Sequence, residues 1–255
     1  MTKRQHHIID YGGEGETIVF LHGFLSSHHY WRKLAPSLVK SGFHVISIDL
    51  IGFGNAPKPA SSSYTYNTHV QYVHNALAQA GVNQPITLVG HSMGALIAMR
   101  YARHYQAWVR TLVLLHPPLY INTEQARTTL RDTSVLYKFL LDHPARHIAW
   151  GTMRRLSMHN LARHSAISRE RSLEHIIERA EGMRDINRLA QPTLLILGSR
   201  DRQIYIDNAR IYLKNSHVLT KIIDTGHHSV MSRPQLILRL IASFAQNSKR
   251  PENKV

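Results

Sequence analysis

The most constraining feature of this 255-residue sequence is the alternation of short apolar runs with longer helical patterns. This alternation is typical of a mostly parallel sheet flanked by helices. The apolar runs are rich in Leu and β-branched residues, as expected for strands buried on both faces. We predict strands at 17–21, 44–48, 86–89, 111–115, 193–197 and 218–223. We predict helices at 30–41, 66–80, 93–105, 206–214 and 234–246.

The alternation stops between about Leu119 and Ile186, where no convincing strand is found. Two helical stripes stand out there: Leu173, Ile176, Ile177 and Ala180, and, earlier, Leu136, Phe139 and Leu140. The segment is too long for a simple loop, so we interpret it as three or four helices inserted over the sheet. The predicted organisation is a core in two parts, 1–118 and 186–255, with a helical cap insertion at 119–185.

Composition excludes several kinds of chemistry. Cysteine is absent, which excludes disulfides, a thiolate nucleophile and a cysteine-based zinc site. The 31 Lys and Arg residues exceed the 16 Asp and Glu residues, for a net charge of +15. This charge is compatible with nucleic acid, an anionic surface or an acidic substrate. We find no run of five basic residues and no nucleic-acid-binding motif, so a generally basic surface is the simpler interpretation.

The same sequence has no apolar segment suited to a signal peptide or a membrane span. We therefore expect a cytoplasmic protein that acts on a small molecule, without a nucleic-acid or membrane partner. The oligomeric state is left open.

The central motif is Gly90-His91-Ser92-Met93-Gly94, which lies between a predicted strand and a predicted helix. A nucleophile at such a junction occupies a very tight turn, and glycines two residues before and after it avoid backbone clashes. The helix N-terminus also favours negative charge that develops at the reacting centre. The motif predicts that Ser92 is a catalytic nucleophile.

A second motif, His22-Gly23-Phe24, follows the first long strand. Gly23 lets the chain turn, which directs the next amide towards the nucleophile. Two N–H donors are needed where the oxyanion of an acyl-transfer reaction appears. We assign them to the backbone amides of Phe24 and Met93, and we expect His22 to pack beneath the loop.

A serine nucleophile needs a base, and the base needs a carboxylate that orients it. Asp201 follows the strand at 193–197 and lies at the sheet edge where ligand crevices form. The last strand leads into Asp224, His227 and His228. The order Ser, Asp, His along the chain is the one expected for a nucleophile on a strand-to-helix turn of this type.

Five blocks together resemble the α/β-hydrolase family with a helical cap, over nearly the whole chain. They are His22-Gly23-Phe24, Asp49-Leu50-Ile51-Gly52-Phe53-Gly54, Gly90-His91-Ser92-Met93-Gly94, Pro192-Thr193 through Gly198-x-x-Asp201, and Gly226-His227 followed by Pro234. The resemblance implies an α/β-hydrolase fold and a serine hydrolase of the esterase or lipase-like type. It selects His227 as base over His228 and Asp201 as acid over Asp224. It also implies that Asp49 stabilises a turn.

Differences from the motifs of individual subfamilies reduce the number of activities that the resemblance implies. Relatives that open epoxides or remove halides use Asp where this chain has Ser92. Carbon–carbon hydrolases often carry Asn before the nucleophile and Trp after the base, where this chain has His91 and His228. Menaquinone-biosynthesis synthases carry Arg soon after the nucleophile's glycines, whereas Arg100 lies one turn further here. The resemblance therefore implies hydrolysis of a carboxylic ester. A carbon–carbon hydrolase or related enzyme acting on an acidic metabolite, and a non-catalytic ligand-binding relative, stay as alternatives.

We expect no cofactor and no metal. His143 and His147 have a spacing that could present a metal, but Pro144 lies between them and no third ligand is evident. The insertion is expected to roof the pocket, with Trp150, Met153 and Met158 as candidate substrate-binding residues. The arginines of the insertion are candidate partners for a substrate carboxylate. The simpler interpretation is that these arginines lie on solvated faces of helices. They include Arg127, Arg131, Arg154 and Arg155.

Overall fold

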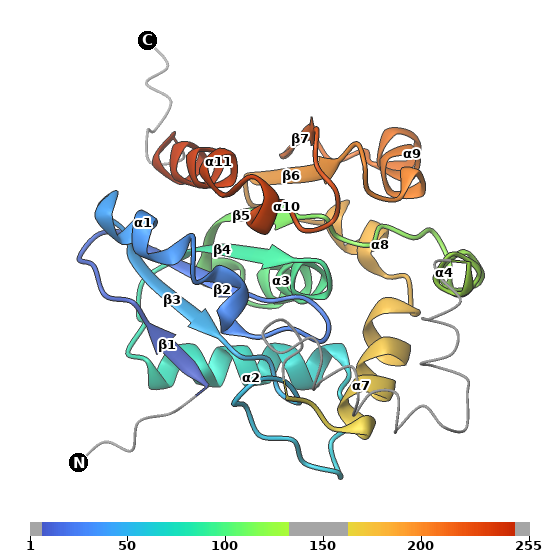
Figure 1. The fold of residues 1–255 in the computed structure, drawn as a ribbon, viewed down its shortest axis with the longest axis horizontal. Coiled ribbons are helices and arrows are strands. Elements are labelled where there is room, and N and C mark those ends of the chain that lie inside the picture. Colours follow the sequence, from blue (N-terminus) through green and yellow to red (C-terminus); the bar gives the residue numbers. More distant parts are fainter. Residues whose placement is uncertain (1–6, 133–162, 248–255) are drawn as a thin grey trace.

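The computed structural model describes residues 7–132 and 163–247, which contain a seven-stranded sheet (Figure 1). The strand order is β1-β3-β2-β4-β5-β6-β7. All neighbouring strands are parallel except β1, which runs antiparallel to β3. The strands are β1 (Ile8–Asp10), β2 (Thr17–Leu21), β3 (His44–Ile48), β4 (Ile86–His91), β5 (Val109–Leu115), β6 (Thr193–Gly198) and β7 (Val218–Ile223).

All six predicted strands are present, and the short strand β1 was missed. β1 has only three residues, too few for a recognisable apolar pattern. The expectation that every strand is buried on both faces is wrong for β7. This strand ends the sheet, so it has a single neighbour, and Leu219 and Ile222 are 52% and 42% exposed.

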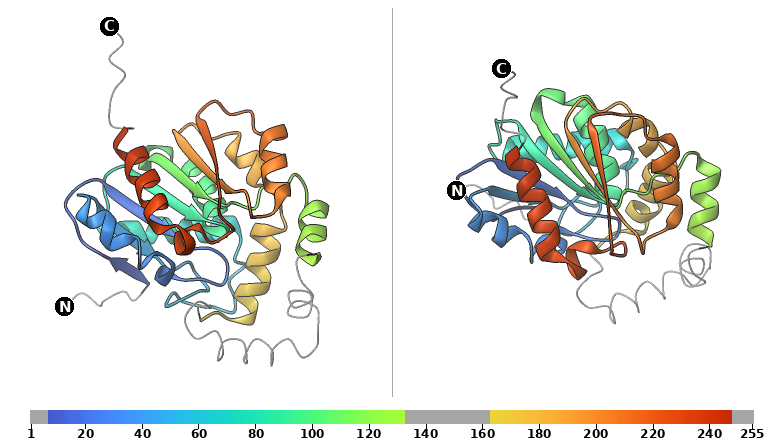
Figure 2. Two further views of the ribbon diagram at one scale, coloured as in Figure 1. Left: turned by 45° about the horizontal axis from the view of Figure 1, so that its top comes forward. Right: turned by 90° about the horizontal axis from the view of Figure 1, so that it is seen from above.

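Helices cover both faces of the sheet, as the two further views show (Figure 2). One face is covered by α1 (Ala35–Lys40) and α11 (Pro234–Asn247), and the other by α2 (Tyr66–Gln79) and α3 (Met93–His104). α9 (Gln203–Tyr212) lies between β6 and β7 in the chain. Shorter elements are η1 (His28–Trp31), η2 (Gln106–Trp108) and α10 (Ser229–Ser232).

The single helix predicted at 30–41 is wrong, because the chain forms the 3-10 turn η1 and then the separate helix α1. Pro36 lies at the start of α1. Proline has no amide hydrogen and its ring disfavours helical backbone before it, so it is tolerated in a first turn but interrupts a longer helix.

The described parts of the segment 119–185 are largely helical. They contain α4 (Thr123–Arg131), α7 (Ala166–Ser172), the π-helical turn η3 (Leu173–Ile177) and the start of α8 (Gly182–Ile186). Leu173, Ile176 and Ile177 are buried against the same core as α3, as their predicted stripe requires. The other stripe, at Leu136, Phe139 and Leu140, lies outside the described residues. The cap and its boundaries therefore stay predictions.

The positive charge of Arg100 is paired with acidic side chains inside the fold. Its guanidinium donates to Asp185 and Glu181 and lies 4.1 Å above the ring of Tyr66. These contacts join α3 to α8, so Arg100 is a structural residue and does not line the cavity described below. No helix within residues 7–132 and 163–247 is long and apolar enough to cross a membrane.

Candidate active site

Ser92 occupies a strained turn between β4 and α3, with φ 52° and ψ −118°. Such a positive φ is uncommon for a residue with a side chain and is found where surrounding structure enforces it. A Cβ on Gly90 would lie 2.5 Å from the Gly94 carbonyl oxygen, and one on Gly94 would lie 2.4 Å from the Leu21 carbonyl oxygen. The Ser92 amide donates to the Leu115 carbonyl over 2.8 Å. Both glycines are therefore required for the turn that presents Ser92.

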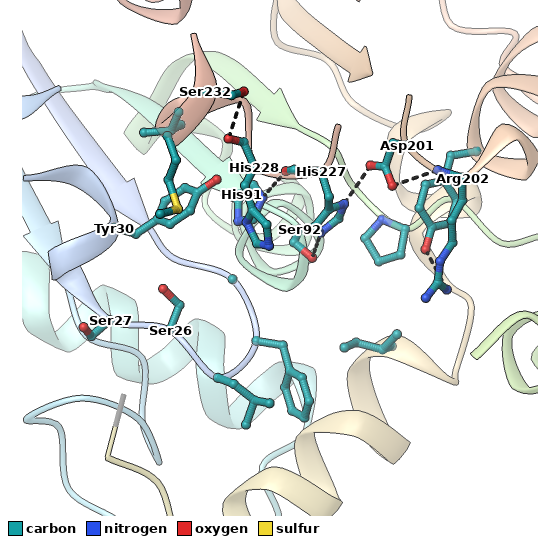
Figure 3. Close-up of a pocket in the computed structure, with 18 of the residues that line it drawn as sticks. Ser26, Ser27, Tyr30, His91, Ser92, Asp201, Arg202, His227, His228 and Ser232 are labelled. Atoms are coloured by element: carbon teal, nitrogen blue, oxygen red, sulfur yellow. Dashed lines mark hydrogen bonds and ion pairs between the residues drawn. The ribbon is translucent and has the colours of Figure 1, made fainter. Parts of the chain in front are cut away.

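A continuous line of hydrogen bonds joins Ser92, His227 and Asp201 (Figure 3). The distance from His227 Nε2 to Ser92 Oγ is 3.0 Å, and from His227 Nδ1 to Asp201 Oδ2 it is 2.7 Å. A carboxylate only accepts, so we assign the ring proton to Nδ1, which leaves Nε2 free to accept the serine proton. Burial alone would raise the pKa of Asp201, but the hydrogen bond from His227 outweighs it and the pKa is lowered.

The alternative acid and base, Asp224 and His228, do not join this line of hydrogen bonds among the described contacts. Asp224 has a side chain 71% exposed and is paired with Arg200 over 2.9 Å. His228 has its pKa lowered by burial and makes no hydrogen bond to Ser92 among the described contacts. The geometry therefore brings together Ser92, His227 and Asp201.

The two predicted oxyanion donors flank the nucleophile. Met93 is the first residue of α3, where amides have no partner within the helix. A Cβ on Gly23 would lie 3.2 Å from Ser92 Cβ, so the loop that leads into Phe24 packs directly against the nucleophile. Neither amide donates a hydrogen bond to another described residue. Their role towards an oxyanion stays a prediction.

A buried network supports this loop. His22 accepts the Leu50 amide at Nε2 over 2.9 Å and contacts the Gly23 carbonyl with Nδ1 over 2.8 Å, so Nδ1 carries the proton. Asp49 accepts the amides of His28 and Asn55, which fixes the turn after β3 as predicted. His28 belongs to the same network. It is buried because its ring also contacts both Asp49 oxygens at 3.0 Å.

Sequence reasoning missed two histidines beside the site. His116 follows β5, with φ 50°, and is fully buried. Its Nε2 lies 2.7 Å from Ser229 Oγ and its Nδ1 3.7 Å from Asp201 Oδ2. His91 stacks on Tyr30 with ring centres 4.4 Å apart, and its Nε2 lies 2.9 Å from the His227 carbonyl oxygen. The position of His116 directly after a parallel strand, as for Asp201 after β6, was the signal that could have found it.

Buried neutral histidines make folding sensitive to mild acid. Burial lowers the pKa of His69, a residue of α2 that contacts Ser172 of α7, to about 3, and that of His116 to about 4. Between these values and 6.5 the unfolded chain binds protons that the folded chain does not, so stability falls as pH falls. We expect the free energy of unfolding to drop by about 2 kcal/mol per such histidine from pH 7 to pH 5.

Urea unfolding at both pH values measures this effect. His69→Phe should remove the share of His69, so its loss of stability between pH 7 and pH 5 should be smaller than that of the wild type. An unchanged pH dependence in this variant would contradict the assignment.

Ser92 and His227 open into a cavity of about 910 Å³. Its apolar lining includes Phe24, Leu25 and Pro118, with Leu130 and Ile177 from the predicted insertion. The candidates Trp150, Met153 and Met158 lie outside the described residues, as do Arg154, Arg155, His143 and His147.

Of the remaining candidate arginines, Arg127 is paired with Glu178 over 2.9 Å, and neither it nor Arg131 is among the described residues of the cavity wall. Within the described residues, no group of three or more His, Asp and Glu side chains is arranged to hold a metal.

Comparison with known proteins agrees with this architecture. Residues 16–151 match the family model of the alpha/beta hydrolase fold. The uncharacterised hydrolase YugF of Bacillus subtilis is 30% identical over 251 residues, which cover 90% of this chain and 89% of that protein. The chain therefore belongs to the α/β-hydrolase family, as its motifs predicted.

Two further comparisons are more limited. The probable lysophospholipase BODYGUARD 4 of Arabidopsis thaliana is 34% identical over 106 residues, which are 41% of this chain and 25% of that protein. The chain thus spans about a quarter of the BODYGUARD proteins that it matches. The crystal structure of a bromoperoxidase from Bacillus anthracis superposes with a TM-score of 0.75 at 19% identity, covering 94% of each chain. This likeness concerns the fold alone.

Proposed function

We propose that this α/β hydrolase cleaves a carboxylic ester of a small molecule through a covalent acyl-enzyme. The observation that carries the proposal is the hydrogen-bonded line from Ser92 Oγ through His227 to Asp201, which opens into the cavity. The BODYGUARD relatives, named as probable lysophospholipases, are ester hydrolases by name and add support.

In the first half-reaction, Ser92 Oγ attacks the acyl carbonyl carbon while its proton moves to His227 Nε2. Asp201 keeps the Nδ1 proton in place and stabilises the imidazolium that forms. The charge that develops on the carbonyl oxygen is taken up by the amides of Phe24 and Met93 and by the positive end of α3. His227 then gives its proton to the departing alcohol.

In the second half-reaction, water replaces the alcohol. His227 takes a proton from the water, which attacks the acyl carbon, and the free acid leaves as Ser92 regains its proton. The cycle needs only the chain's own residues and water, so the proposal requires no cofactor.

The test is hydrolysis of p-nitrophenyl esters from acetate to decanoate. Each buried methylene contributes about 0.8 kcal/mol, or about fourfold in kcat/KM, so kcat/KM should rise with chain length until the cavity is filled. The length at which it stops rising measures the acyl pocket. A wild-type enzyme without turnover on any of these esters would exclude a general esterase and leave a specialised hydrolase or a binding protein.

A further inference from the structure

Arg202 is a cation of the cavity wall that has no carboxylate partner within residues 7–132 and 163–247. Arg202 follows Asp201 at the start of α9 and lines the cavity. Its Nη1 donates to the hydroxyl oxygens of Tyr120, over 3.0 Å, and Tyr205, over 3.4 Å. Figure 3 shows Arg202 beyond Asp201, on the opposite side of the pocket from Tyr30 and His91.

No carboxylate among the described residues pairs with the Arg202 guanidinium. Asp201 is adjacent, but its oxygens accept from the Arg202 backbone amide and from His227. Other arginines do have carboxylate partners, and these include Arg100, Arg103, Arg127 and Arg200. A partly desolvated cation is costly without such a partner, so an anion that enters the cavity would be stabilised there.

The two tyrosines fix the guanidinium and leave donors free. Their hydroxyl oxygens lie 2.9 Å apart, and both side chains are buried. Burial raises the pKa of Tyr120 and of Tyr205, so both phenols are neutral at physiological pH. The bond between them uses one of their two O–H donors, and the bonds from Arg202 use only Nη1 of a group with five N–H donors. The cluster can therefore offer several further hydrogen bonds to one anion.

We propose that Arg202, held by Tyr120 and Tyr205, is an anion-binding subsite of the catalytic cavity. The substrate would then be an ester that carries a carboxylate or phosphate group as well as an apolar part. This inference rests on the proposed function and specifies its substrate class. Arg32 and Lys33 also line the cavity, but both are exposed and are not held by such a pair of phenols.

The test compares matched neutral and anionic esters. On the alcohol side, methyl 4-(butanoyloxy)benzoate is compared with 4-(butanoyloxy)benzoate and with 4-(butanoyloxy)phenyl phosphate. On the acyl side, p-nitrophenyl pentanoate is compared with mono-p-nitrophenyl glutarate. The pair with the larger preference shows which side carries the anion, and the two alcohol-side anions separate carboxylate from phosphate.

Arg202→Gln should lower the ratio of kcat/KM for the anionic ester to that for its neutral partner by about 10- to 100-fold, through KM rather than kcat. Arg202→Lys should restore part of this ratio, because it keeps the charge but not the planar fork. Arg210→Gln removes the same charge from an exposed position of α9 and should leave the ratio unchanged. This control separates the subsite from general attraction of anions by a basic protein.

If the ratio of kcat/KM for anionic and neutral esters is unchanged in Arg202→Gln, the proposed subsite is wrong. It is also wrong if this ratio falls in Arg32→Gln or Lys33→Gln and not in Arg202→Gln. Binding measured by calorimetry distinguishes this failure from failure of the proposed function. In the Ser92→Ala background, the better anionic ester should bind about 10- to 100-fold more weakly when Arg202→Gln is added. This difference in binding is expected even if the wild type hydrolyses none of the esters. Equal binding by the two proteins would also overturn the proposal.

Discussion

Ser92→Ala should lower kcat for p-nitrophenyl esters by about a million-fold, which leaves only the residual acceleration that binding and the oxyanion donors supply. The variant loses the atom that forms the acyl bond, while the cavity and the oxyanion donors stay in place. KM should therefore change little. The measurement is steady-state hydrolysis at saturating ester, with urea unfolding to show that the variant is folded.

Ser26→Ala is the matched control, because Ser26 lines the same cavity but has no hydrogen bond to His227 among the described contacts. We expect it to change kcat less than tenfold. Retention of a tenth or more of the wild-type rate in Ser92→Ala would exclude Ser92 as the nucleophile.

Asp201→Asn should lower kcat by about 10⁴-fold. The carboxylate accepts the Nδ1 proton of His227 over 2.7 Å, and the isosteric amide instead favours the tautomer with its proton on Nε2. That proton would face Ser92 Oγ and prevent His227 from acting as a base. Combined with Ser92→Ala, the change should add almost nothing, because residues that act as one unit are not additive.

Asp224→Asn is the control for the choice between the two carboxylates. Asp224 is exposed and pairs with Arg200, so its replacement should leave kcat within about twofold, since surface ion pairs contribute little. A larger loss of kcat in Asp224→Asn than in Asp201→Asn would show that the acid was assigned wrongly.

Local patterns were sufficient for much of the fold. Strands β2 to β6 follow from largely apolar runs, because a parallel strand covered by helices on both faces is apolar along most of its length. The pattern does not report how many neighbours a strand has, which is why β7 was expected to be buried. Pro36 was a local signal against one helix over 30–41, and its effect was underestimated.

The members of the candidate site could be selected because each follows a strand. Ser92, Asp201 and His227 come after β4, β6 and β7, and the carboxyl ends of parallel strands lie at one edge of the sheet. Which of two neighbouring histidines reaches Ser92 was chosen from family resemblance. The Nε2–Oγ distance of 3.0 Å supports the same choice from geometry.

Short spacings and strand ends were therefore enough to predict six of the seven strands and the turn at Ser92, and the family resemblance selected His227 and Asp201 from their neighbours. Only the tertiary structure placed His116 beside Asp201 and joined Arg202 to Tyr120 and Tyr205. Tyr120 and Arg202 are separated by 82 residues. Contacts of this kind arise from packing between distant elements, and neither periodicity nor spacing encodes which side chains will be buried together.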